Sequence, residues 1–172
     1  LHLREENGFL PDLNALRAMM RPDTRMIATN NPNNPTGALM DREMLTQIAE
    51  IARGSDAWVL CDEVYRGTDQ AGDGYTASIC DLYDKGISTA GMSKAYSLAG
   101  LRVGWVAGPR DLLERIMIHR DYNTISVGRI DEYFSALALE NRGKILERAH
   151  RITRENLAIL SDWVEAEPLI SW

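Results

Sequence analysis

The amino-acid sequence predicts an α/β fold, in which a mostly parallel sheet carries helices on both faces. Two observations lead to this prediction. Short apolar segments typical of buried strands alternate with amphipathic helical patterns through most of the chain, and the C-terminal part is helical throughout. The chain has 172 residues, of which 45% are hydrophobic and 26% charged, as is typical of a globular domain with its own core.

A strand–helix–strand unit is predicted in the first part of the chain. A short amphipathic helix begins near Asp12, and buried strands follow at 25–29 and 57–61. Between these strands, Asp41 can cap a helix that ends at Gly54. Such a unit implies that its two strands are parallel.

The second part of the chain predicts two more strands and then helices. The strands are expected at 86–90 and 101–107, and Pro109 suits the first turn of the following helix. From Arg129 onward the pattern is helical, with an interruption at 141–143. The last helix is long and carries many Arg and Glu residues on its polar face, so we expect it to connect to a further domain.

Four polar residues, Asn34, Asp62, Lys94 and Arg102, lie at or just beyond the predicted strand ends. Ligands of open α/β sheets bind outside the carboxyl ends of the strands, so we expect these side chains to converge. Lys94 has small and apolar neighbours, and both burial and a nearby cation disfavour an ammonium ion, which makes Lys94 a candidate nucleophile. Taken singly, the four residues also fit a turn former, a helix cap, a loop lysine and an ion-pair partner.

Three motifs give the chain a resemblance to the class I and II aminotransferases, the fold type I enzymes that use pyridoxal 5′-phosphate (PLP) and include aspartate aminotransferase. The motifs are Asn-Asn-Pro-Thr-Gly at 33–37, Asp-Glu-Val-Tyr at 62–65 and the Ser-Lys stretch at 91–104. The resemblance covers essentially the whole chain, which would be the central fragment of a typical member. It implies that residues 1–140 belong to the PLP-binding large domain and residues 141–172 form a connector helix to a small domain that is missing here.

The same resemblance implies three catalytic residues, Lys94, Asp62 and Tyr65. Lys94 would hold PLP as a Schiff base and then move a proton between substrate and cofactor. Asp62 would keep the pyridine nitrogen protonated, and Asn34 and Tyr65 would hydrogen-bond the 3′ oxygen of the ring. The Asn34–Pro35 peptide bond would be cis, as the resemblance also suggests.

Cofactor binding would further involve Ser93 and Arg102, which the resemblance places at the phosphate. A planar, bidentate guanidinium is well suited to this group. Many relatives have a serine where this chain has Gly91, so the phosphate hydroxyl would come from Thr89 or Ser93 instead.

The resemblance implies an enzyme of amino-acid metabolism, a biosynthetic homodimer that moves an amino group from an amino acid to a 2-oxo acid. The two cysteines, which lack metal-type spacing, predict a cytoplasmic protein with reduced thiols. Two alternatives remain open. One is a PLP enzyme of the same fold with other chemistry, a lyase or an amino-acid oxidase; the other is a non-catalytic PLP-binding fragment or regulator module. The substrate-carboxylate arginine and an N-terminal phosphate loop of the family fall outside this sequence, so we expect these residues alone to be inactive.

Composition argues against several other classes of protein. The net charge of −6 is unfavourable for binding nucleic acid, and the apolar runs are too short to span a membrane. The three histidines are dispersed, so we expect no metal site, and Cys61 is expected to be a buried strand residue rather than a nucleophile. The first residue is not Met, from which we expect the chain to begin within a longer protein.

Overall fold

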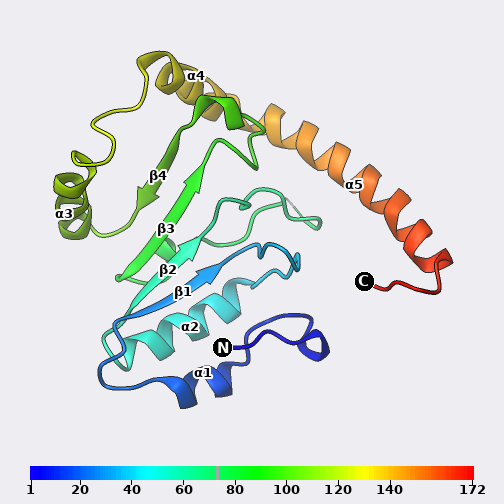
Figure 1. Ribbon diagram of the computed structural model, residues 1–172, viewed down its shortest axis with the longest axis horizontal. Coiled ribbons are helices and arrows are strands. Elements are labelled where there is room, and N and C mark those ends of the chain that lie inside the picture. The colour runs from blue at the N-terminus through cyan, green and yellow to red at the C-terminus, as the bar shows by residue number, and fades with distance from the viewer. Residues whose placement is uncertain (73) are drawn as a thin grey trace.

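The computed structural model describes residues 1–72 and 74–172 and confirms the α/β class (Figure 1). Its sheet has the strand order β1-β2-β3-β4. The first three strands are parallel and the fourth is antiparallel to the third, so the sheet is mostly parallel as predicted. The strands are β1 (Met26–Asn30), β2 (Trp58–Asp62), β3 (Gly86–Gly91) and β4 (Gly104–Ala107).

Helix α2 (Arg42–Arg53) joins β1 to β2 and forms the core with one face of the sheet. Asp41 caps the helix as expected, because its Oδ1 accepts a hydrogen bond from the Met44 N–H at 2.8 Å. The apolar residues of α2 face the sheet and exclude water from the interface. The core residues with no exposed surface include Leu45, Ile48, Ala49, Ala52, Val59 and Cys61.

The N-terminal helix α1 (Leu13–Met19) packs beside α2 and begins after Asp12, where the sequence predicts its start. The Asp12 carboxylate accepts hydrogen bonds from the backbone N–H groups of Asn14 and Ala15 at 2.8 and 3.1 Å. Figure 1 shows both helices on the same side of the sheet. The opposite face is more open within the described residues, since Met26 is 46% and Val106 40% exposed.

The fourth strand is shorter than the sequence predicts. We expected a strand over 101–107, but β4 begins only at Gly104. Ala99–Leu101 forms a 3-10 turn, and Arg102 follows with φ +53°, in the left-handed region where a strand cannot continue. The stretch before β4 therefore belongs to the loop that carries Lys94.

Helices make up the C-terminal part, as expected. They are α3 (Arg110–Arg120), α4 (Arg129–Glu140) and α5 (Arg142–Ala166). Pro109 sits at the N-cap of α3, one residue earlier than expected, and only Asn141 separates α4 from α5. None of the helices in the described part of the chain combines the length and apolarity needed to cross a membrane.

The apolar side chains of α4 are largely uncovered by the residues described. Ile130 is 71% and Tyr133 66% exposed, although their spacing correctly indicated an amphipathic helix. Helix α5 extends away from the sheet along one side of the molecule (Figure 1). Periodicity therefore predicted these helices, but not what covers their apolar faces.

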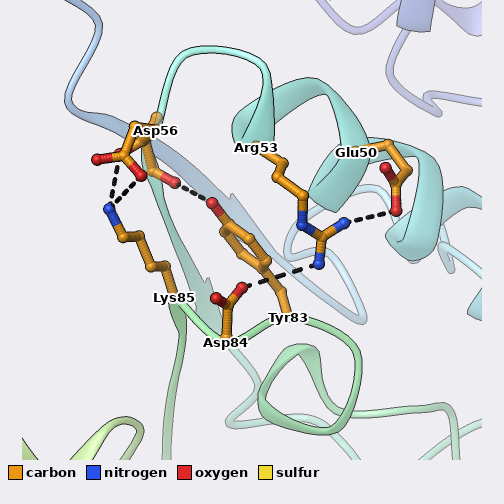
Figure 2. A network of polar contacts seen from close by, with 7 residues as sticks. Glu50, Arg53, Asp56, Tyr83, Asp84 and Lys85 are labelled. Atoms are coloured by element: carbon orange, nitrogen blue, oxygen red, sulfur yellow. Dashed lines mark hydrogen bonds and ion pairs between the residues drawn. The ribbon is translucent and has the colours of Figure 1, made fainter.

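A polar network joins α2 to the starts of β2 and β3 (Figure 2). The Tyr83 hydroxyl donates to the Ala57 carbonyl at 2.8 Å, and burial raises the pKa of this hydroxyl. Around it, Lys85 pairs with Asp56, and Arg53 lies 4.9 Å from the Tyr83 ring centroid. The exposed ion pairs contribute little individually, so the buried tyrosine and its hydrogen bond are the main link.

We predict that Leu45→Ala lowers the free energy of unfolding by roughly 2–5 kcal/mol, because it leaves a cavity at a side chain with 0% exposure. Leu169→Ala makes the same chemical change at a side chain that is 88% exposed, and should change stability by less than about 0.5 kcal/mol. Urea denaturation followed by circular dichroism measures both. Equal losses in the two variants would contradict this description of the core.

Candidate active site

The structure brings together three candidate residues that follow three different strands. The Asn34 Nδ2 donates a hydrogen bond to the Tyr65 hydroxyl at 3.0 Å. The Lys94 Nζ lies 5.6 Å from the Tyr65 ring centroid, over the face of the ring. Tyr65 is thus the common neighbour of an amide and an amine, and polar groups from the loops after β1, β2 and β3 meet at its ring.

Asp62 is the last residue of β2 and lies at the same edge of the sheet. In the parallel register it is paired with Asn30 on one side and Thr89 on the other. Its Oδ1 accepts a hydrogen bond from the Val64 N–H at 3.1 Å and lies 3.5 Å from the Thr89 hydroxyl. The carboxylate is exposed, so it can accept a further donor from the open face of the sheet.

Asn30 was missed by sequence reasoning, yet it connects two of these loops. Its Nδ2 donates to the Asp62 carbonyl at 2.9 Å, and its Oδ1 accepts from the Asn34 N–H at 2.7 Å. One side chain thereby holds the Asn34 backbone against the end of β2. From the sequence we expected the asparagine-rich segment only to form a turn. A hydrogen-bond partner about thirty positions away leaves no signal in the local sequence.

The turn after β1 is fixed by a second asparagine. Asn31 is 1% exposed and exchanges two hydrogen bonds with the Met40 backbone, at 2.8 and 3.0 Å. The Asn34–Pro35 bond is cis, in agreement with the resemblance, and the Asn31–Pro32 bond is cis as well.

The Lys94 loop is held at its base by Met92, which has no exposed surface. The Met92 N–H donates to the Val103 carbonyl at 3.0 Å, and the Met92 carbonyl accepts from the Leu98 N–H at 2.9 Å. Lys94 itself is exposed, so the burial expected from its apolar neighbours is not found among the described residues. Those neighbours pack beneath the loop instead of around the amine.

The fold gives a steric reason for the glycine at position 91. Gly91 pairs with Gly104 where β3 ends and β4 begins, and an added Cβ would lie 3.0 Å from the Val103 carbonyl oxygen and 3.2 Å from the Gly104 Cα. A serine there would require the two strands to separate slightly. Any phosphate hydroxyl on this chain must therefore come from elsewhere in the loop.

The candidate phosphate residues are less closely associated. Ser93 is half-buried in the turn after β3, while the Thr89 hydroxyl is directed at Asp62. Arg102 is exposed and its Nη1 donates to the Ala99 carbonyl at 2.9 Å. Among the residues that the structure describes, Arg102 forms no hydrogen bond or ion pair with the other candidate side chains.

Glu63 is a second residue that sequence reasoning missed. Its carboxylate is buried, with 3% of the residue exposed, and accepts hydrogen bonds from the Ser78 hydroxyl at 3.0 Å and the Ile79 N–H at 2.8 Å. These bonds anchor the segment that follows Tyr65 at its far end. They also leave the neighbouring Asp62 as the carboxylate that faces solvent.

Cys61 is buried in β2, as expected. Burial raises the pKa of its thiol to about 12, so the thiol stays protonated at neutral pH. A protonated, inaccessible thiol is a poor nucleophile and a poor metal ligand. Over residues 1–72 and 74–172, no group of three His, Cys, Asp or Glu side chains is arranged to hold a metal ion.

A known protein family and several individual proteins are similar to this chain. The family model for aminotransferase class I and II matches residues 1–152. Capreomycidine synthase of Streptomyces vinaceus is 35% identical over 164 residues, 95% of this chain and 42% of that protein. Aromatic-amino-acid aminotransferase 2 of Thermococcus litoralis is 32% identical over 139 residues, 80% of this chain and 36% of that protein.

A solved structure is similar over nearly the whole chain. It is a PLP-dependent aminotransferase from Streptococcus suis 89-1591, with a TM-score of 0.93 and 48% sequence identity. The match covers 99% of this chain and 45% of that one. The chain thus spans less than half the length of the relatives that it matches.

The buried thiol predicts a pH dependence of stability. The folded state disfavours the Cys61 thiolate, whereas the unfolded chain ionises freely above its ordinary pKa of about 8.5. The contribution of the neutral thiol is therefore complete below pH ~8.5 and is lost as the pH rises toward 12. Between pH 8 and 10, we expect wild type to lose roughly 1–2 kcal/mol more stability than Cys61→Ala.

Urea denaturation of both proteins at the two pH values measures this difference. Cys80 is present in both and serves as an internal control, since burial raises the pKa of its thiol too. Identical losses in wild type and Cys61→Ala would show that Cys61 is not the responsible group.

Proposed function

Because this chain belongs to the class I and II aminotransferases, we propose that it supplies the cofactor-binding part of an enzyme that transfers an amino group from an amino acid to a 2-oxo acid. Members of this family depend on PLP. The observation that carries the proposal is the meeting of Asn34, Tyr65 and Lys94 at the sheet edge where Asp62 also lies. In this proposal, residues 1–140 belong to the PLP-binding large domain and residues 141–172 to a connector helix.

The side chains at this edge fit PLP chemically. When bound, PLP withdraws electrons from the substrate Cα and stores the amino group between the two half-reactions. The exposed Lys94 amine is accessible to an aldehyde carbon, and the exposed Asp62 carboxylate can pair with a protonated ring nitrogen. Asn34 and Tyr65 are already hydrogen-bonded to each other, so both can reach one phenolic oxygen.

Each catalytic residue then has a definite task. Lys94 would hold the cofactor through its Nζ and, once released, would carry a proton to or from the substrate Cα. The negative charge of Asp62 would keep a proton on the ring nitrogen. The Tyr65 oxygen accepts from Asn34, which leaves the tyrosine O–H free to donate to the cofactor.

Phosphate binding is assigned to Arg102, with Ser93 and Thr89 as the hydroxyl donors. One Arg102 nitrogen is used by the Ala99 carbonyl, and the remaining N–H groups of the exposed guanidinium can bind an oxyanion. Thr89 would have to rotate away from Asp62 to contribute, so we favour Ser93.

We also propose the setting in which the enzyme works. The names of its relatives support amino-acid metabolism, with amino acids and 2-oxo acids as substrates. The free thiols of Cys61 and Cys80 support a reducing, cytoplasmic location. The exposed apolar residues of α4, such as Ile130 and Tyr133, support a homodimer in which a face of this kind is covered.

The role of Lys94 predicts a spectroscopic result for the holoenzyme that contains this chain. Wild type with PLP should show a visible absorbance band that borohydride reduction fixes covalently to the protein. Lys94→Ala should lose both the band and the covalent label, because the substitution removes the amine to which the proposal assigns the Schiff base. Lys85→Ala is the matched control, since Lys85 lies at the opposite end of β3 and should keep both signals. A label that survives in Lys94→Ala would remove Lys94 from its role.

The reaction itself is tested by adding an amino donor without a 2-oxo acid. We expect the visible band to convert to that of the amino form of the cofactor, and adding a 2-oxo acid should restore it. Tyr65→Phe should slow the conversion by about 10²-fold or less, as for loss of one positioned proton donor. If the protein binds PLP but none of the twenty common amino acids converts the band, the aminotransferase proposal is contradicted. That result would favour an enzyme with other PLP chemistry.

A further inference from the structure

Helix α5 is connected to the segment that follows Tyr65, residues 66–72, which we call the Tyr65 loop. The His150 Nε2 lies 2.7 Å from the Gly67 carbonyl oxygen, so this nitrogen carries the hydrogen and donates it. Four residues later, the Arg154 Nη2 donates to the carbonyl oxygens of Asp69 and Gly72 at 3.2 and 3.3 Å. Three backbone carbonyls of one loop are thus held by two side chains on one face of the helix.

At Gly74, which follows the Tyr65 loop in sequence, the backbone approaches α5 too closely to allow a side chain. Gly74, with φ +82°, would place an added Cβ 2.1 Å from the His150 ring. Gly67, with φ +98°, would place one 3.3 Å from the Tyr75 ring and 3.4 Å from Leu146, which is buried. The glycines permit both the left-handed backbone and the direct packing of the imidazole against the chain.

Only one tight turn separates this contact from Tyr65. The Tyr65 carbonyl accepts hydrogen bonds from the Thr68 N–H at 3.0 Å and from the Thr68 hydroxyl at 2.7 Å. Gly67, the acceptor of the His150 hydrogen bond, lies inside that turn. A displacement of α5 therefore moves a short, internally bonded unit that includes the Tyr65 backbone.

We infer that His150, assisted by Arg154, is a positioning residue that sets the place of the Tyr65 hydroxyl relative to Asn34 and Lys94. The inference rests on the proposed function for the role of Tyr65, but the link between α5 and the Tyr65 loop does not. Displacing a catalytic group by about 1 Å can cost on the order of 10²-fold in rate, so an anchor two residues from Tyr65 is close enough to matter. The position of α5 is in this way coupled to the site.

The first test compares two substitutions of His150 in the holoenzyme. His150→Leu keeps the approximate volume but removes the donor, whereas His150→Gln places an amide N–H near the position of Nε2. His119→Leu is the matched control, because His119 is exposed on α3, on the other side of the sheet (Figure 1). Arg154→Met provides a second way to release the loop if His150→Leu folds poorly.

The readouts separate the contact from its effect on the site. Hydrogen exchange of the Thr68 amide, measured without PLP, should rise about 10-fold in His150→Leu, as for loss of a hydrogen bond, and return toward wild type in His150→Gln. The pH midpoint of the cofactor absorbance band should shift in His150→Leu and Arg154→Met. It should stay at the wild-type value in His150→Gln and in the control His119→Leu. The rate constant kcat should fall about 10-fold in His150→Leu, with KM little changed.

A double-mutant cycle with Tyr65→Phe identifies the route. If His150 acts through the Tyr65 hydroxyl, His150→Leu should cause no further loss of kcat in the Tyr65→Phe background. Additive losses, or an unshifted absorbance midpoint despite faster exchange, would show that His150 only holds the loop, and would overturn the inference. Unchanged exchange would overturn the link itself, whereas a wild-type protein with no cofactor band would instead refute the proposed function and the positioning role with it.

Discussion

The parallel register of β1, β2 and β3 is the constraint on which the candidate site depends. It sets Asn30, Asp62 and Thr89 side by side at one edge of the sheet, and the three following loops inherit that alignment. Asn30 then fastens the first loop to the second strand. A shift of one residue in any of these strands would send the aligned side chains to the opposite face, so the packing of α2 against one face fixes the candidate side chains on the other.

The fold was largely predictable from the sequence because its signals are local. Asp41 and Gly54 mark the ends of α2, and the apolar spacing between them is helical. Arg102 shows where local signals fail: nothing in the sequence marks its left-handed backbone, so β4 was predicted too long. The unexpected exposure of Lys94 has a similar origin, because apolar neighbours can pack below a loop as well as around its side chain.

In the candidate site, only the positions of the motif residues were predictable from the sequence. Motif residues such as Asp62 and Lys94 could be placed at strand ends, where ligands of such sheets bind. The side chains that hold the loops, Asn30 and Glu63, were missed because their partners are distant in sequence or are backbone groups. His150 lies further still from the segment that it contacts. Long-range hydrogen bonds of this kind require the folded chain to be seen.

The network around Tyr83, drawn in Figure 2, precedes the first residues of β2 and β3, whereas Asp62 and Lys94 lie at or beyond the other ends of these strands. Enzymes often lose activity when they are stabilised, because the same residues serve both purposes. In the proposed function, these two purposes would be divided between opposite ends of the same strands. Substitutions around the buried Tyr83 hydrogen bond therefore change stability at a distance from the proposed site.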